Sequence, residues 1–152
     1  MLQLESIHKD TYDLLKRLSA KKELNSFALA GGTALALLLG HRISIDLDFF
    51  TGNDFESSGL LETLSRCFKT ENCSTSLNSL SLSISHRSSS VKIDFIRHGY
   101  PRLRPLIVAD QIHIFSIEDI AAMKLNAIAN RGAKKDFYDV YGLLTKFSLK
   151  EL

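Results

Sequence analysis

Two aspartates, Asp46 and Asp48, are separated by a single residue within the apolar run 43–50. On a β-strand, side chains two residues apart share a face and lie about 6.5–7 Å from each other. Two carboxylates in that position repel each other, and burial without partners would destabilise the fold further. We therefore expect a cation between them. A pair of divalent metal ions about 3.5–4 Å apart, bridged by phosphate oxygens, fits this space and predicts a phosphoryl-transfer site.

A glycine pair precedes the acidic run and could hold the phosphates. Gly31, Gly32 and Thr33 lead from an apolar strand predicted at 27–30 into a helix predicted at 34–39, with Thr33 as its cap. Glycine lets the backbone approach a phosphate closely, and the helix N-terminus offers unpaired N–H groups. The Thr33 hydroxyl adds another donor. Alone, a Gly-Gly turn is most often an ordinary tight turn, but beside an acidic strand it becomes a specific signal.

A third carboxylate is predicted at Asp94. Apolar residues occupy the odd-numbered positions of the strand predicted at 91–96, so Asp94 points to the opposite face. If this strand pairs beside 43–50, Asp94 completes a three-carboxylate cluster that binds a catalytic metal ion. It would also orient or deprotonate an acceptor hydroxyl. The alternative is a surface aspartate on an edge strand, paired with Arg97.

The C-terminal third of the chain supplies cations and two further acids. Lys124 could hold a triphosphate as a point charge, and Arg131 or Lys135 could contact a phosphate. Asp136 and Asp139 are one helical turn apart and could anchor Lys124 or Arg131. The alternative is a solvated, charge-laced helix pair, which is the more common meaning of such a run taken by itself.

Two further basic features lie outside this run. Arg42 directly precedes the acidic run and could touch a phosphate or balance the aspartates, whereas His41 is expected to be a loop residue. The densest basic patch consists of Arg97, His98, Tyr100, Arg102 and Arg104. It could receive an RNA backbone or be a solvated loop, and the loop is the preferred interpretation. The histidines lack ligand spacing, so no histidine metal site is expected.

Hydrophobic periodicity predicts the elements that position these residues. Helices are predicted at 3–20 and 34–39, from Ser57 or Ser58 to residue 68, from a capping box at Ser116 and Asp119 to about residue 130, and at 133–147. Strands are predicted at 27–30, 43–50, 80–85 and 91–96, the last two as a hairpin, with one or two short edge strands within 106–115. The length of 152 residues predicts one domain, residues 1–152.

Composition narrows the class of protein. The hydrophobic fraction of 45% and charged fraction of 24% are typical of a globular protein, and no apolar run approaches the length of a membrane helix. The N-terminus lacks the pattern of a signal peptide, and Cys67 and Cys73 are expected to be free thiols. We therefore expect a cytoplasmic protein without membrane contact. The net charge of +2 does not by itself establish nucleic-acid binding.

Three segments together resemble the AbiEii/AbiGii toxin family, nucleotidyltransferases of the DNA polymerase β-like superfamily. They are GGTALAL at 31–37, HRISIDLDFF at 41–50 and KDFYD at 135–139. The resemblance spans about residues 27–144 and implies an α+β, minimal nucleotidyltransferase fold, with a small mixed sheet flanked by helices and a C-terminal helix pair. It also implies that Gly31, Gly32 and Thr33 face the nucleotide phosphates, that Asp46 and Asp48 bind two magnesium ions, and that Lys124 and Asp136 belong to the cleft.

The resulting expectation is a Mg²⁺- or Mn²⁺-dependent nucleotidyltransferase that uses a nucleoside triphosphate as substrate. By resemblance, the acceptor is a tRNA 3′ end or a protein hydroxyl, within a toxin–antitoxin or phage-defence system that includes a cognate antitoxin. The alternative is a catalytically inactive module that binds nucleotide, RNA or a protein partner, and small-molecule nucleotidylation ranks last. Family members usually continue through further C-terminal helices. The alternatives for this chain are therefore a compact member, a fragment or a truncated gene product.

Overall fold

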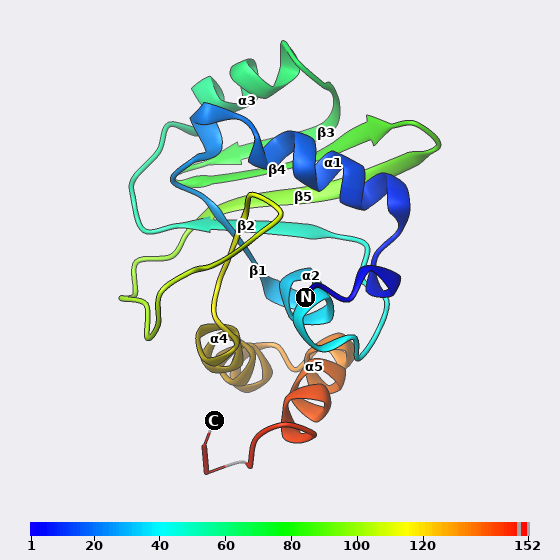
Figure 1. Cartoon of the computed structure of the whole chain (residues 1–152). Helices are drawn as coiled ribbons and strands as arrows, with labels where there is room; N and C mark the ends of the chain where they lie inside the picture. Colours follow the sequence, from blue (N-terminus) through cyan, green and yellow to red (C-terminus); the bar gives the residue numbers. More distant parts are fainter. Residues whose placement is uncertain (149, 152) are drawn as a thin grey trace.

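Residues 1–148 and 150–151, which the computed structural model describes, contain one seven-stranded mixed sheet (Figure 1). Its strands are β1 (Ala28–Ala30), β2 (Leu47–Thr51), β3 (Lys69–Ser76), β4 (Ser79–His86), β5 (Ser89–Arg97), β6 (Ile107–Ala109) and β7 (Ile112–Ile114). Their order across the sheet is β3-β4-β5-β2-β1-β7-β6. β2 runs parallel to β5 and β1 parallel to β7, and the other neighbouring pairs are antiparallel. The predicted mixed sheet is confirmed.

Five α-helices flank the sheet within the described part of the chain. They are α1 (Lys9–Ser19), α2 (Gly31–Leu39), α3 (Ser57–Ser65), α4 (Ile117–Asn130) and α5 (Lys134–Leu144). α1 contacts β4, β5 and β7, α3 contacts β3 and β4, and α2 contacts β1 and β2. α4 and α5 pack against each other and against α2, so these three helices form a cluster (Figure 1). None of the described helices is both long and apolar enough to cross a membrane.

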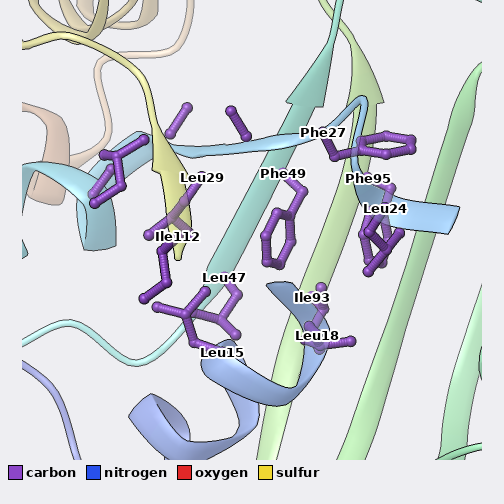
Figure 2. Packing of buried hydrophobic residues seen from close by; sticks show 14 of the residues in the cluster. Leu15, Leu18, Leu24, Phe27, Leu29, Leu47, Phe49, Ile93, Phe95 and Ile112 are labelled. Carbon is purple, nitrogen blue, oxygen red and sulfur yellow. The ribbon is translucent and has the colours of Figure 1, made fainter. Parts of the chain in front are cut away.

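The alternation of apolar and polar residues decides which sheet face is buried. Leu47 and Phe49 of β2, together with Ile93 and Phe95 of β5, point into the core beneath Leu18 of α1 (Figure 2). The rings of Phe49 and Phe95 stack with their centroids 5.2 Å apart. Successive strand residues point to opposite faces, so the residues between them turn away from this core. The aspartates of both strands therefore share the other face.

The first predicted helix and the strand predicted at 43–50 are both shorter than expected. The helix predicted at 3–20 is divided into a 3₁₀ turn at Leu4–Ser6 and α1, because Ile7 forms an isolated parallel bridge with Ser44. The strand predicted at 43–50 begins only at Leu47. Ile43 and Ile45 precede this strand and are 64% and 59% exposed, so the first part of the apolar run does not contribute to the core.

The rest of the sheet follows the predicted pattern with one omission. β4 and β5 form the predicted hairpin, and the region 106–115 contains β6 and β7. β3 was not predicted, because its residues are almost all polar and most are exposed. It pairs with β4 at the sheet edge, with a register shift between Glu71 and Ser74. An edge strand with one solvated face needs no apolar run.

Candidate active site

Asp48 and Asp94 lie side by side on adjacent parallel strands. Their Cα atoms are paired in the register between β2 and β5. Both side chains line a cavity of about 630 Å³, a size that suits a nucleotide-sized ligand. Asp46 lines the same cavity although it precedes β2 rather than belonging to it. The structure thus places the three predicted carboxylates along one cavity. β5 is an inner strand and Arg97 pairs with Asp54, so the alternative of an edge aspartate paired with Arg97 is wrong.

The two glycines at the start of α2 allow close contacts that a side chain would block. Gly31 has a φ of +67°, and a Cβ atom at this position would collide with the carboxylate of Asp48. A Cβ atom on Gly32 would collide with the guanidinium of Arg42. The helix begins at Gly31 rather than at residue 34, and both glycines line the cavity. The first turn of α2 therefore lies directly against the carboxylates.

Thr33 has a different role from the predicted one. Its side chain is buried inside α2, does not cap the helix and does not line the cavity, so the prediction that it faces the phosphates is wrong. The Thr33 hydroxyl contacts the Ser44 hydroxyl at 2.8 Å and donates to the Asp46 carbonyl. These contacts fasten the irregular segment before β2 to α2. Thr33 thereby positions Asp46.

The cavity carboxylates are only partly neutralised by neighbouring cations. Burial raises the pKa of Asp48 above its ordinary value, and the negative charge of Asp94 raises it further, against the opposing effect of Lys124. Among the described residues, no group donates a hydrogen bond to the Asp48 carboxylate. Lys92 Nζ lies 2.9 Å from Asp94 Oδ2, and Lys135 Nζ lies 3.6 Å from Asp46 Oδ2. Asp48 is therefore a largely buried carboxylate that receives no direct hydrogen bond or ion pair from the described residues.

A second acidic cluster lies behind the cavity, between α4 and α5. Lys124 Nζ lies 3.0 Å from Asp136 Oδ1 and 2.7 Å from Asp139 Oδ2, and both carboxylates are fully buried. Arg131 donates to Asp136 through Nε and Nη2, at 2.8 and 2.9 Å. The hydrogen bond from Arg131 lowers the pKa of Asp136 to about 2, assisted by Lys124. Burial of these side chains excludes the alternative of a solvated helix pair.

Arg42 and His41 complete this buried cluster from the segment after α2. Arg42 donates to Asp139 through Nε at 2.7 Å and Nη2 at 3.1 Å, and His41 Nε2 lies 2.8 Å from Asp139 Oδ1. Burial by itself raises the pKa of Asp139, but hydrogen bonds from His41, Arg42 and Lys124 together lower it below its ordinary value. Arg42 thus balances Asp139 rather than Asp46 and Asp48.

His41 is more than the loop residue predicted from the sequence. Its ring packs against α5, where a Cβ atom on Gly142 would lie 2.7 Å from His41 Cδ2. Nδ1 is buried without a hydrogen-bond partner among the described residues. A glycine inside a helix costs about 1 kcal/mol relative to alanine, so Gly142 was the one local signal of a close contact. It did not identify the partner.

Most of the predicted site residues line the cavity. Those that do are Gly31, Gly32, Arg42, Asp46, Asp48, Asp94, Lys124, Arg131 and Lys135. Asp136 does not line the cavity, because it is enclosed behind Lys124 and Arg131. It anchors these two cations instead of contributing to the cleft wall. Sequence reasoning missed Lys92, which holds Asp94, and its spacing of two residues from Asp94 on one strand was the available signal.

The carboxylate oxygens of Asp48 and Asp94 are the hard donors that Mg²⁺ prefers. Within the described residues, no three histidine, cysteine or acidic side chains converge closely enough to enclose a metal ion. Mg²⁺ is usually held by only one or two carboxylates, with water and substrate phosphates completing its shell. Asp48 and Asp94 could therefore bind a cation that enters together with a phosphate ligand. They do not form part of a site in which the described protein residues alone enclose the ion.

A mixed sheet with carboxylates on adjacent strands, beside a helix opened by two glycines, is suited to phosphoryl transfer from a bound nucleotide. The chain belongs to the family described as "Nucleotidyl transferase AbiEii toxin, Type IV TA system", whose pattern matches residues 13–152. It is therefore a nucleotidyltransferase-family protein, and a nucleoside triphosphate is the substrate that this family implies.

One relative is similar in sequence, and two solved structures share the fold. The uncharacterized protein aq_aa25 of Aquifex aeolicus (strain VF5) is 34% identical over 155 residues, which cover 98% of this chain and 73% of that protein. JHP933 from Helicobacter pylori is similar in structure, with a TM-score of 0.65 and 19% identity, covering 97% of this chain and 71% of JHP933. A second H. pylori structure, provisionally assigned as a nucleotidyltransferase, has a TM-score of 0.64, with 20% identity over 95% of this chain and 68% of that one.

Proposed function

We propose that the protein transfers a nucleoside monophosphate from a nucleoside triphosphate to a hydroxyl group of RNA or protein, in a Mg²⁺- or Mn²⁺-dependent reaction. The observation that carries this proposal is the pairing of Asp48 with Asp94 on adjacent parallel strands, where burial, and then repulsion by Asp94, raise the pKa of Asp48. Asp48 has no direct cationic partner among the described residues. This supports the proposal that the substrate brings a metal ion to the carboxylate pair.

The reaction can be derived from the residues that line the cavity. The acceptor oxygen attacks the α-phosphorus, the new O–P bond forms as the bond to pyrophosphate breaks, and Asp94 takes the acceptor proton. Gly31 and Gly32 let the backbone at the start of α2 approach the phosphates. A bound divalent metal ion, held by Asp48 and Asp94 with Asp46 nearby, would neutralise charge on the phosphates and polarise the α-phosphoryl group.

The cations on α4 and α5 divide into two groups. Lys135 and Arg131 reach the cavity from exposed positions and can bind the pyrophosphate portion. Lys124 also lines the cavity, but its ammonium group is held by two buried aspartates and supplies a fixed positive charge. Because this charge is held in place by the protein, it needs no reorganisation when the phosphates bind.

Membership of the family supports a wider biological proposal. We extend the proposed activity to that of a toxin component in a toxin–antitoxin or phage-defence system, with a cognate antitoxin as partner and tRNA among the acceptors to test. Nucleoside triphosphates and tRNA are cytoplasmic, so the proposed place of action is the cytoplasm.

The test compares wild type with Asp48→Asn in a labelling assay. Each α-³²P nucleoside triphosphate is incubated with Mg²⁺ or Mn²⁺, total tRNA and a protein fraction, and labelled products are identified by mass. We expect label in one acceptor class, reduced by at least about a hundredfold in the variant. The matched control is Asp110→Asn, a change of an exposed aspartate at positive φ that lies outside the cavity.

The outcomes separate the proposal from its alternative. Nucleotide-dependent thermal stabilisation without transfer to any acceptor identifies a catalytically inactive binding module. Transfer that survives Asp48→Asn contradicts the proposed site.

A further inference from the structure

A second hollow adjoins the nucleotide cavity. It has a volume of about 350 Å³ and lies between the end of β2 and the loop that follows β5. We call it the loop groove; its lining includes Phe50, His98, Tyr100, Arg102 and Phe115. Phe50 also lines the nucleotide cavity, so one side chain forms the boundary between the two hollows. A ligand in the loop groove therefore lies next to a ligand in the cavity.

The strand geometry places the loop groove in line with the catalytic carboxylates. Asp48 and Phe50 share a face of β2, and Asp94 and Ile96 share a face of β5. The two strands are parallel, so both run from the carboxylates towards the groove. Each pair of residues advances about 6.5–7 Å, which puts His98 about 13 Å along from Asp94. A flexible chain end held in the groove can reach the carboxylates over this distance.

The loop that forms the groove is held in place at both ends. The backbone N–H of His98 donates to the Thr51 carbonyl at 2.7 Å. The buried Asp119 carboxylate accepts from the backbone N–H groups of Leu103 and Arg104, at 2.7 and 3.2 Å. Asp119 is in turn bonded to the helix cap Ser116. The groove is therefore formed before any ligand binds.

Aromatic rings line the groove and one of them faces solvent. The His98 ring lies 5.8 Å from Phe50 and 5.3 Å from Tyr100, measured between centroids, and 6.3 Å from Phe115. Burial lowers the pKa of His98, so its ring is neutral at physiological pH. Tyr100 is 75% exposed although it stands beside this cluster. An exposed ring on a fixed loop is available for stacking.

The charge of the loop favours an anionic ligand. Residues 97–104 contain three arginines and no acidic residue. Arg97 and Arg104 have acidic neighbours, Asp54 at 3.0 Å and Glu118 at 3.5 Å. Arg102 lines the groove, is exposed and forms no ion pair within the described chain. Aromatic stacking surfaces combined with arginines are the elements that bind single-stranded nucleic acids.

We infer that the loop groove binds the single-stranded end of a polynucleotide acceptor, with a base stacked on Tyr100 and a phosphate near Arg102. This inference rests on the proposed transfer reaction, of which it specifies the acceptor. The terminal hydroxyl of the strand is then directed past Phe50 towards Asp94, where it attacks the α-phosphorus as described above. A protein acceptor would have no use for the stacking surface.

The first experiment measures binding without catalysis. Fluorescence anisotropy follows a labelled single-stranded RNA of about twelve nucleotides with a free 3′ hydroxyl, and a DNA of the same sequence, in the absence of nucleoside triphosphate. We expect Tyr100→Ala to raise the dissociation constant about tenfold. Arg102→Ala should weaken binding and reduce the slope of log affinity against log salt by about one. Tighter binding of RNA than DNA assigns the acceptor to RNA, and equal binding assigns it to either polynucleotide.

Matched controls come from residues outside the loop groove. Tyr141→Ala removes a tyrosine of similar exposure, 72%, on α5, and Arg66→Ala removes an exposed arginine beside α3. Both should bind as wild type does. Because Tyr100 is exposed, its removal should leave the thermal unfolding temperature unchanged, which separates lost binding from lost folding. Equal binding by wild type and Tyr100→Ala overturns the inference.

The second experiment distinguishes failure of the inference from failure of the proposed function. In the transfer assay, Tyr100→Ala should raise KM for the acceptor and leave KM for the nucleoside triphosphate unchanged. Transfer to a protein acceptor at the wild-type rate by Tyr100→Ala overturns the groove as the acceptor site and leaves the transferase intact. Oligonucleotide binding by the wild type without transfer to any RNA, DNA or protein acceptor overturns both the acceptor role and the proposed function.

Discussion

The two groups of aspartates in this molecule lie in opposite environments. Asp48 and Asp94 face an open cavity from the sheet, and the Asp48 carboxylate has no hydrogen-bonding partner in the described chain. Asp136 and Asp139 are enclosed between α4, α5 and the segment after α2, and each accepts from at least two cationic groups. Among the described residues, the Asp48 carboxylate is thus left without a direct partner, whereas Asp94 is held by Lys92 alone and Asp136 and Asp139 are each compensated by several cations.

The pKa of Asp48 moves in the opposite direction from those of Asp136 and Asp139. The pKa of Asp48 is raised by burial and by Asp94, whereas hydrogen bonds lower the pKa of Asp136 to about 2 and that of Asp139 below its ordinary value. A group whose charge is unfavourable in the free protein is suited to bind a cation. A group whose charge is fully compensated serves to hold its partners. We therefore propose that the first cluster is the ligand site and the second its scaffold.

The largest effect is expected when the scaffold cluster loses a charge. Asp139→Asn leaves Lys124 and Arg42 with an incomplete set of acceptors in a buried position. Removing one partner of a buried ion pair typically costs about 3–5 kcal/mol. We expect a loss of this size in the free energy of unfolding, measured by urea denaturation at neutral pH. Asp110→Asn changes an exposed side chain and keeps an acceptor oxygen for the Tyr12 hydroxyl, so it should alter the free energy of unfolding by less than about 0.5 kcal/mol. A loss below about 1 kcal/mol for Asp139→Asn would show that the cluster does not stabilise the fold.

A change in pH is expected to have an intermediate effect on the free energy of unfolding, through Asp136. The folded-state pKa of Asp136, about 2, is below the ordinary 3.8, so its stabilising contribution is complete above pH 3.8 and is lost as the pH falls through 2. The shift corresponds to about 2 kcal/mol. We expect Asp136→Asn to be less stable than wild type at pH 6 and to show a shallower loss between pH 4 and pH 2. Urea unfolding across this range measures the difference. Parallel curves for the two proteins would contradict the assignment.

Much of this comparison was accessible from the sequence, because alternation in a strand decides which side chains share a face. The even positions of 91–96 placed Asp94 opposite the core, and the register of β5 with β2 confirmed that placement. The spacing of Asp136 and Asp139 correctly indicated anchors for Lys124 and Arg131. These inferences depend on local periodicity, which is visible in any single sequence.

Other features depended on contacts between distant residues and could not be predicted. His41 and Asp139 are 98 residues apart, and nothing local distinguishes their hydrogen bond from two solvated side chains. Thr33 had the sequence of a helix cap, but α2 starts at Gly31, three residues before the predicted start, and Ala30 occupies the cap position. Ile43 and Ile45 extend the apolar run of β2 in the sequence, but both precede the strand and are exposed to solvent. In each case tertiary packing overrode a local pattern.

The smallest expected change in stability has the opposite sign and tests the ligand cluster. At neutral pH the raised pKa of Asp48 means that its ionised form destabilises the folded state, because the folded protein binds the proton more tightly than the unfolded chain. Asp48→Asn removes the repulsion with Asp94 and should stabilise the metal-free protein by about 1 kcal/mol, in the manner of other active-site substitutions that relieve strain.

The same variant should lose its response to metal ions. Wild type is expected to gain thermal stability when millimolar Mg²⁺ or Mn²⁺ is added with a nucleoside triphosphate, because a ligand that binds only the folded state stabilises it. Asp48→Asn should begin at a higher unfolding temperature and gain little. Differential scanning fluorimetry with and without metal measures both quantities, and Asp110→Asn should behave as wild type does. If Asp48→Asn is less stable than wild type without metal, its carboxylate belongs to the scaffold, and the distinction between the two clusters fails at the residue on which the proposed chemistry depends.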